Sequence, residues 1–401
     1  MNALRKVSPT GLAILWLITR AWALASGSQL LPYPQSQFLF SDVQLYDWWS
    51  SNISDGHFPI NDPMWQYPPL AALIFFAGYS IATNTVGFIF LTVVVDAIVM
   101  GVLVATCRSR QLPNYLPAII WLAAPVIMGP IMLGRFDVFP TLMMILGLLA
   151  VNSPLRSGAW FAVGALLKVW PGLGLLTVRR DKLVRTTLAF TITGLAGSIL
   201  LKLWWPGSFS FVSGQRSRGL QIESVGALPY MWWNAGPHTV STGFRYGAIE
   251  VVANGTSVVS ALITFITVIA LGRIALWRLQ GRIETVEPAD AALAIVLIAM
   301  ITSRVLSPQY NIWIFGILAV CAFKPSKDFA LITKLFFVSA LCGQILYPFA
   351  YVAYQQGEVF PTIVQTIRIA TLMWATFLAW RQLHLAARNS DRTSQAALAN
   401  S

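Results

Sequence analysis

Charged residues are few in this chain of 401 amino acids: they make up 10% of it, whereas hydrophobic residues make up 56%. The mean hydropathy is +0.66. A typical soluble domain carries roughly 25% charged residues, because its surface is in contact with water. The shortage of charge therefore excludes an ordinary soluble domain and indicates a protein whose surface mostly faces a lipid bilayer.

Cysteine and histidine are also rare, with three residues of each type. The spacing of Cys107, Cys321 and Cys342 fits neither a disulfide framework nor a zinc site. The sequence has no Walker loop, dinucleotide-binding glycine pattern, HExxH or GxSxG motif. It also lacks the Asp-x-Asp pair that would suggest a metal-dependent nucleotide-sugar site. We therefore expect no cofactor, no metal and no soluble nucleotide as the activated substrate.

We do not expect the net charge of +12 to reflect nucleic-acid binding. The basic residues are not interleaved with aromatic ones as in a nucleic-acid module, so a nucleic-acid partner is excluded. Membrane topology and affinity for anionic lipid headgroups explain the excess of positive charge instead.

Apolar runs, each about long enough to cross the roughly 30 Å hydrocarbon core as a helix, make up most of the sequence. They predict an all-α polytopic membrane protein with about 12 transmembrane helices (11–13) and short external interfacial helices. There is no β-barrel alternation, heptad run or internal repeat. The twelve expected spans cover residues 10–27, 68–83, 87–106, 115–131, 137–151, 158–177, 186–205, 247–272, 289–304, 309–323, 329–349 and 363–382.

Short loops rich in Lys and Arg stay on the cytoplasmic side of a membrane. With twelve spans, the following basic segments share one side: Arg5 and Lys6, 179–185, 273–282, Lys324 and Lys327, and a tail with Arg381, Arg388 and Arg392. Arg108 and Arg110 oppose this pattern, because the same count puts them outside; partial re-entry of the preceding spans would explain the exception.

This topology defines the expected domain organisation. We expect one transmembrane domain over residues 1–385, with a first external loop at 28–66 and a second large one at 206–245. A disordered cytoplasmic tail is expected over 386–401.

The first candidate site lies in the first external loop, where Asp42, Asp47, Asp55 and Asp62 accompany several aromatic residues. Rings such as that of Tyr46 suit the membrane interface and can also stack on the C–H face of a sugar. The following segment, with Tyr67 before two prolines, stiffens the return to the bilayer. An ordinary solvated loop is the alternative interpretation.

Lys168 is the second candidate, because it lies among apolar residues in the sixth expected span. A lysine near the bilayer centre costs about 2.5–3.5 kcal/mol on insertion scales, so it usually faces a cavity or an acidic partner. Snorkelling of its side chain to the inner interface is the alternative.

Two further candidates lie in segments expected outside. Arginine binds phosphate with a bidentate fork, so arginines in the second external loop indicate an anionic lipid ligand or headgroup. A polar break at 303–310 either lines a wet cavity or is a plain turn. The candidate residues of these segments are Arg216, Arg218, Gln221 and Glu223, and then Arg304, Gln309 and Tyr310. Arg135 and Asp137 form a similar pair, which the topology places toward the inside unless the neighbouring helices are re-entrant.

A series of short strings in this sequence resembles glycosyltransferase family 87, a family of membrane enzymes in the GT-C superfamily, and its actinobacterial members in particular. The resemblance runs from about Asp42 to Tyr310. The strings are Asp42 with Tyr46, Tyr67-Pro68-Pro69, GRFDVFP from Gly134, ALLKVWP from Ala165, RGLQIES from Arg218 and VLSPQY from Val305.

The resemblance implies a glycosyltransferase whose donor is a polyprenyl-phosphate sugar. It implies transfer of mannose from such a donor to a lipid-linked glycan outside the plasma membrane, in lipoglycan and cell-envelope biosynthesis. Asp42 would be the catalytic base, because an attacking hydroxyl must lose its proton to a carboxylate within reach. Inverting displacement would give an α-linkage, and the cations of Lys168, Arg216, Arg218 or Arg304 would stabilise the leaving phosphate without a metal.

Two other functions fit the same residues. A transporter or flippase of lipid-linked sugar would use the cations but would not need Asp42 as a base. A noncatalytic subunit of an envelope-building complex would transfer no sugar by itself. Arabinose and glucose remain alternatives to mannose as the donor sugar.

Overall fold

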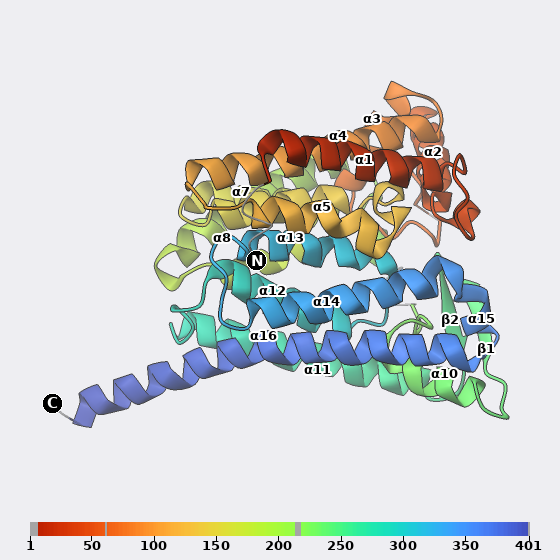
Figure 1. The fold of residues 1–401 in the computed structure, drawn as a ribbon. Coiled ribbons are helices and arrows are strands. Elements are labelled where there is room, and N and C mark those ends of the chain that lie inside the picture. Colours follow the sequence, from red (N-terminus) through yellow and green to blue (C-terminus); the bar gives the residue numbers. More distant parts are fainter. Residues whose placement is uncertain (1–6, 61, 213–217, 400–401) are drawn as a thin grey trace.

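The structure is a computed structural model that describes residues 7–60, 62–212 and 218–399. Its regular structure is almost all helical, which confirms the all-α prediction (Figure 1). The α-helices are α1 (Pro9–Gly27), α2 (Ser41–Ser54), α3 (Leu70–Ile81), α4 (Thr85–Ser109), α5 (Leu116–Met128), α6 (Val138–Leu149), α7 (Pro154–Leu167), α8 (Arg180–Trp204), α10 (Leu228–Asn234), α11 (Thr256–Leu279), α12 (Pro288–Ile301), α13 (Asn311–Cys321), α14 (Phe329–Gln344), α15 (Tyr351–Gln355) and α16 (Val359–Ala399).

Shorter elements connect these helices. They are the 3-10 turns η2 (Ser36–Phe38), η3 (Pro130–Gly134), η4 (Trp170–Thr177), η5 (Val225–Ala227) and η6 (Pro308–Tyr310), the π-helical turn η7 (Ile345–Phe349), and the strands β1 (Ser241–Arg245) and β2 (Ala248–Val252). The two strands form an antiparallel hairpin in which Arg245 pairs with Ala248.

Six of the described helices, α1, α4, α8, α11, α14 with η7, and α16, are long and apolar enough to cross a membrane. Five shorter apolar segments lie in α3, α5, α6, α12 and η6 with α13. The helices therefore indicate a multi-pass membrane protein, and they do not confirm the count of twelve spans.

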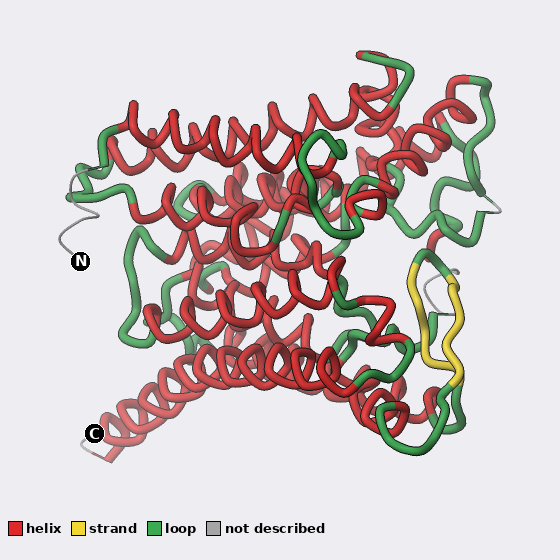
Figure 2. The backbone as a smooth tube through the Cα atoms, turned by 45° about the vertical axis from the view of Figure 1, so that its right-hand side comes forward, coloured by secondary structure: helices red, strands yellow, loops and turns green. Residues whose placement is uncertain are grey.

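The bundle has two ends, which Figures 1 and 2 show at right and left. At the hairpin end lie β1, β2, α10 and α15. At the opposite end, the basic end, α1 begins and α16 ends. Contacts join the turns of the basic end to one another: Arg110 with Phe323, Lys182 with Asn152, Arg179 with Glu284, Lys324 with Glu287, and Arg381 with Asp328. All of the described basic clusters therefore share one end of the molecule.

Arg108 and Arg110 conform to this pattern, so the expectation that they lie opposite the other basic segments is wrong. The guanidinium of Arg110 lies 4.8 Å from the ring of Phe323, at the end of α13 in the basic end. Helix α4 reaches this end, whereas α3, with 12 residues, is about 18 Å long and too short to cross the hydrocarbon core. The expected span at 68–83 therefore does not cross the bundle. This agrees with the partial re-entry that would explain the positions of Arg108 and Arg110.

The prediction of one span at 158–177 is also wrong. This part of the chain consists of two segments, and the chain turns back between them at Lys168. Helix α7 ends at Leu167, and Lys168 has extended backbone angles. The 3-10 turn η4 then returns to the basic end, where the carbonyl of Leu176 accepts a hydrogen bond from Arg278. Pro171 explains the break, since proline in a helix interior removes a backbone donor and clashes with the preceding turn.

Two expected boundaries also differ. Residues 248–252 of the expected span 247–272 form β2, because their β-branched side chains suit a strand, and α11 begins only after Gly255 at φ 82°. Helix α16 continues to Ala399 where a disordered tail was expected from residue 386. The tail contains alanine, leucine, arginine and glutamine, which favour helix, and neither glycine nor proline.

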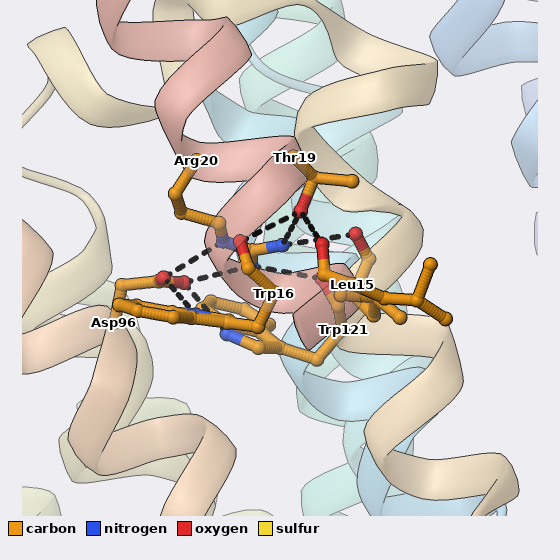
Figure 3. A network of polar contacts seen from close by, with 7 residues as sticks. Leu15, Trp16, Thr19, Arg20, Asp96 and Trp121 are labelled. Atoms are coloured by element: carbon orange, nitrogen blue, oxygen red, sulfur yellow. Dashed lines mark hydrogen bonds and ion pairs between the residues drawn. The ribbon is translucent and has the colours of Figure 1, made fainter. Parts of the chain in front are cut away.

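A closed polar network fastens α1 to α4 and α5 inside the bundle (Figure 3). The Asp96 carboxylate accepts hydrogen bonds from Arg20 through both oxygens, and from the indole N–H groups of Trp16 and Trp121. Arg20 also donates to the Leu122 carbonyl. Arg20 is 2% exposed and Asp96 is not exposed, so every charge here is neutralised within the protein, as burial in an apolar bundle requires.

Candidate functional site

A cavity of about 830 Å³ opens at the hairpin end. Its walls come from segments far apart in the sequence: α2, the turn after Met64, the loop of Arg135, the reversal at Lys168, the tip of the β-hairpin, residues 305–310 and residues 347–355. Ten of the thirteen predicted site residues line this cavity: Asp42, Tyr46, Tyr67, Arg135, Lys168, Arg218, Gln221, Glu223, Gln309 and Tyr310.

Asp42 lies in the first turn of α2 and faces Arg135 across the cavity wall. Its Oδ2 is 3.2 Å from Nε of Arg135, and the two side chains are 35% and 5% exposed. Arg135 donates hydrogen bonds to the carbonyls of Leu39 and Gly134, which fix its position. This contact corrects the expected placement of Arg135 toward the inside: it lies at the same end as Asp42, because α3 does not cross the bundle.

Tyr46 and Tyr67 lie next to this ion pair. Their hydroxyl oxygens are 3.0 Å apart, and the ring of Tyr46 stacks on Phe75 at 4.3 Å. Burial, together with the nearby Asp42 carboxylate, raises the pKa of both phenols above their ordinary value. Both hydroxyls are therefore neutral and able to donate hydrogen bonds over the physiological pH range.

Lys168 is held by a buried carboxylate below the cavity surface. Its Nζ donates a hydrogen bond of 2.6 Å to Oδ1 of Asp137, and the same oxygen accepts one of 2.5 Å from the indole N–H of Trp313. Asp137 is not exposed, whereas Lys168 is 19% exposed and lines the cavity. Asp137 thus also lies at the hairpin end, contrary to the expected inside placement, and supports the wall from behind.

The segment 218–224 contributes a second cation and a buried acid. The Arg218 guanidinium donates to the Tyr246 carbonyl at the hairpin tip. Glu223 is 1% exposed, accepts hydrogen bonds from Gln221 and Arg368, and has a pKa that burial raises although Arg368 opposes the shift. The side-chain oxygen of Gln221 accepts from the Leu306 N–H, so this acid and amide connect the wall to α16 and residue 306.

The remaining predicted residues have different surroundings. Tyr310 stacks on Trp313 at 4.0 Å, and the Gln309 side chain accepts a hydrogen bond from Ser307. Arg304 lies behind the cavity wall, where its guanidinium donates to the Arg218 carbonyl. Arg216 lies outside the described residues.

The other acids between α1 and α3, Asp47, Asp55 and Asp62, do not line the cavity. Asp62 accepts hydrogen bonds from the indole of Trp49 and the backbone N–H of Met64, so it holds the fold of this segment. Asp55 is exposed where α2 ends. Burial raises the pKa of Asp47.

Sequence reasoning missed several residues of the site. Trp313 and Arg368 bind the acids Asp137 and Glu223, and Tyr347 and Tyr351 line the cavity. Arg368 has a usable signal, since it is a charged residue within an expected span, and such residues usually have a partner. Trp313 has none, because tryptophan is common in membrane helices near the interface.

No group of three potential metal ligands occurs among the residues that the structure describes. The sequence model of glycosyltransferase family 87 matches residues 65–308, which is more than half of the chain. This match includes most of the cavity-lining residues but begins after Asp42. No curated protein matches the chain.

Proposed function

Because the chain belongs to glycosyltransferase family 87, we propose that it transfers a sugar, with mannose as the first candidate, from a polyprenyl-phosphate donor to a hydroxyl of a lipid-linked glycan at the outer face of the plasma membrane. Membership in the family supports a membrane glycosyltransferase. The lipid donor, the sugar and the side of the membrane are the proposal.

One observation carries the assignment of the base. Of the described acids that line the cavity, Asp42 and Glu223, only Asp42 is accessible, with 35% of its side chain exposed. Glu223 is 1% exposed and already accepts hydrogen bonds from Arg368 and Gln221. A general base must reach the proton that it removes, so Asp42 is the base in our proposal.

The proposed reaction is a single displacement. The acceptor oxygen attacks the anomeric carbon while its proton passes to Asp42, and the bond from that carbon to the phosphate oxygen breaks with its electrons staying on the phosphate. A β-linked donor then gives an α-linked product, and one carboxylate is sufficient for an inverting transfer. The proton leaves Asp42 to water or to the released lipid phosphate after the reaction.

Fixed cations favour this reaction by stabilising the leaving phosphate. Lys168 and Arg218 both line the cavity, and each is held by a hydrogen bond, to Asp137 and to the Tyr246 carbonyl respectively. Arg304 acts indirectly in this proposal, since it holds the backbone of Arg218.

The distribution of basic residues supports the outer face as the place of reaction. The described basic clusters join the turns of the basic end, which the positive-inside rule assigns to the cytoplasm. The cavity lies at the opposite, hairpin end.

The test is transfer by the purified chain in vesicles offered labelled polyprenyl-phosphate sugars, with mannose, arabinose and glucose compared and nucleotide sugars included. We expect transfer from a lipid donor and an α-linked product. Asp42→Asn should lose transfer about 100-fold or more while it still binds donor, because general base catalysis contributes roughly 10²–10⁴-fold. The matched control is Asp55→Asn, which removes an exposed carboxylate from the end of the same helix.

Three results would contradict the proposal. Sugar-lipid translocation that Asp42→Asn leaves unchanged would identify a transporter. Absence of transfer with every donor and acceptor would support a noncatalytic subunit. Transfer from nucleotide sugars alone would refute the lipid donor.

A further inference from the structure

Two buried carboxylates of this chain have similar partners. Asp96 binds Arg20 and two tryptophan indoles, and Asp137 binds Lys168 and the indole of Trp313. Both carboxylates are fully buried. The two clusters differ in how completely their hydrogen bonds are satisfied. This difference separates a cluster that only holds helices together from one that can also bind a ligand.

The Asp96 cluster is closed, as Figure 3 shows. Both oxygens of Asp96 accept hydrogen bonds, and Arg20 donates additionally to the carbonyls of Trp121 and Leu122. Arg20 is 2% exposed. A ligand would find little of this cation to bind.

The Asp137 cluster is open toward the cavity. Oδ2 of Asp137 is buried without a hydrogen-bond partner among the described residues. The ammonium of Lys168 can donate three hydrogen bonds. Within the described part of the chain it donates one, to Asp137. Lys168 is 19% exposed on the cavity side, so donors remain for a ligand there.

Aromatic rings hold the ammonium of Lys168 in place. Nζ lies 5.2 Å from the ring centroids of Tyr310 and Trp313, and 5.9 Å from that of Tyr67. Trp313 therefore acts twice, since its N–H binds Asp137 and its ring attracts the cation. The ring of Trp313 stacks on Tyr310 and on Trp170, and these two contacts keep it from rotating away.

We propose that Asp137 and Trp313 are positioning residues, which hold the Lys168 ammonium at the cavity wall with its remaining N–H bonds available to the phosphate oxygens of the lipid donor. This inference rests on the proposed function for the identity of the anion. Asp137 touches no substrate in this arrangement; it acts through Lys168.

Stability alone does not explain the Asp137–Lys168 pair. Removing two charges from water is unfavourable, and a buried ion pair can often be replaced by apolar residues with no loss of stability. An orphaned acceptor such as Oδ2 of Asp137 is unfavourable as well. If Lys168 is held in position to bind an anionic ligand, both the buried ion pair and the unpaired Asp137 oxygen have a function.

The experiment is a double-mutant cycle on the full-length chain in vesicles, with Asp137→Asn, Lys168→Gln and the double variant. We expect each single variant to lower kcat/KM for the lipid-phosphate donor about 100-fold, because misplacement by about 1 Å can have that effect. The double variant should be no worse than Lys168→Gln alone, since Asp137 acts only through that cation. Asp137→Glu should recover part of the activity.

Two further measurements separate positioning from folding. The apolar pair Asp137→Leu with Lys168→Met should keep the Tm of the wild type and lose affinity for polyprenyl phosphate, the probe without sugar. The matched control Asp96→Asn removes a similar buried carboxylate from the closed cluster. It should lower the Tm and leave the KM for donor unchanged.

The outcomes distinguish this inference from the proposed function. Wild-type transfer together with an unchanged KM and polyprenyl-phosphate affinity in Asp137→Asn would overturn the inference alone. Independent, multiplicative losses in the double variant would also overturn it. A wild-type chain that neither binds polyprenyl phosphate nor transfers its sugar would overturn both.

Discussion

Glu223 and Arg368 are 145 residues apart in the sequence, and their side chains meet in an ion pair of 2.7 Å. They are 1% and 2% exposed. Arg368 also donates to the Leu306 carbonyl, so one guanidinium on α16 connects two segments of the cavity wall. The last long helix thereby supports the site at a distance from Asp42.

Breaking this pair should destabilise the protein strongly. Arg368→Met leaves the Glu223 carboxylate buried without its cation, and loss of one member of a buried pair costs about 3–5 kcal/mol. Thermal unfolding in detergent measures the effect. Adding Glu223→Leu to Arg368→Met should restore much of the stability, whereas Arg388→Met, an exposed arginine of the same helix, should change little. Equal Tm values for Arg368→Met and Arg388→Met would contradict the structural role.

Glu250 predicts a pH dependence of stability. Burial raises the pKa of this β2 carboxyl above its ordinary value of 4.5, although the Gly219 N–H and the charges of Arg218 and Arg245 oppose the shift. The folded state then binds the proton more tightly than the unfolded state. The stabilising contribution is complete below 4.5 and is lost as the pH rises through the higher pKa of the folded state.

Glu250→Gln removes this titration while keeping the size of the side chain. We expect similar Tm values for wild type and variant near pH ~4, and a relatively more stable variant near pH ~7. The control Glu358→Gln removes an exposed glutamate at the same end of the bundle. A Tm difference between Glu250→Gln and the wild type that is constant over this range would refute the prediction.

Local chemistry made some of the site predictable from the sequence. Lys168 could be identified because a lysine among apolar residues needs water or an acid, and it has both: a cavity on one side and Asp137 on the other. Asp42 could be selected as an acid beside aromatics, and it lines the same cavity. Their roles in catalysis remain predictions.

The topology was less predictable, because apolar length alone does not show where a chain turns back. A short helix such as α3 and a reversal such as that at Lys168 contain enough apolar residues to look like spans. The first of these errors moved Arg135 and Asp137 to the wrong end in the expected topology, although the helices before and after them were recognised. The second, which follows them in the chain, offset the first for the basic turn after η4. Partners such as Arg368 depend on packing between distant helices, which hydropathy does not encode.

The ring of Phe40 lies between two glycines, and this gives a prediction for the position of Arg135. A Cβ on Gly134 would lie 2.3 Å from Cδ1 of Phe40, and one on Gly27 would lie 2.2 Å from Cζ of the same ring. The ring cannot move away from one glycine without approaching the other. Gly134→Ala must therefore displace the backbone next to Arg135, whose Nε lies 3.2 Å from Asp42.

We expect Gly134→Ala to lower the rate of sugar transfer about 10- to 100-fold, since small displacements of catalytic groups have effects of this size. The double variant Gly134→Ala with Phe40→Leu should recover part of this loss, because a smaller side chain leaves room for the methyl group. Gly101→Ala is the matched control: it lies in α4, where an added Cβ meets nothing within 4 Å. Normal transfer by Gly134→Ala would show that the Asp42–Arg135 geometry tolerates displacement, and would weaken the assignment of this pair to the reaction.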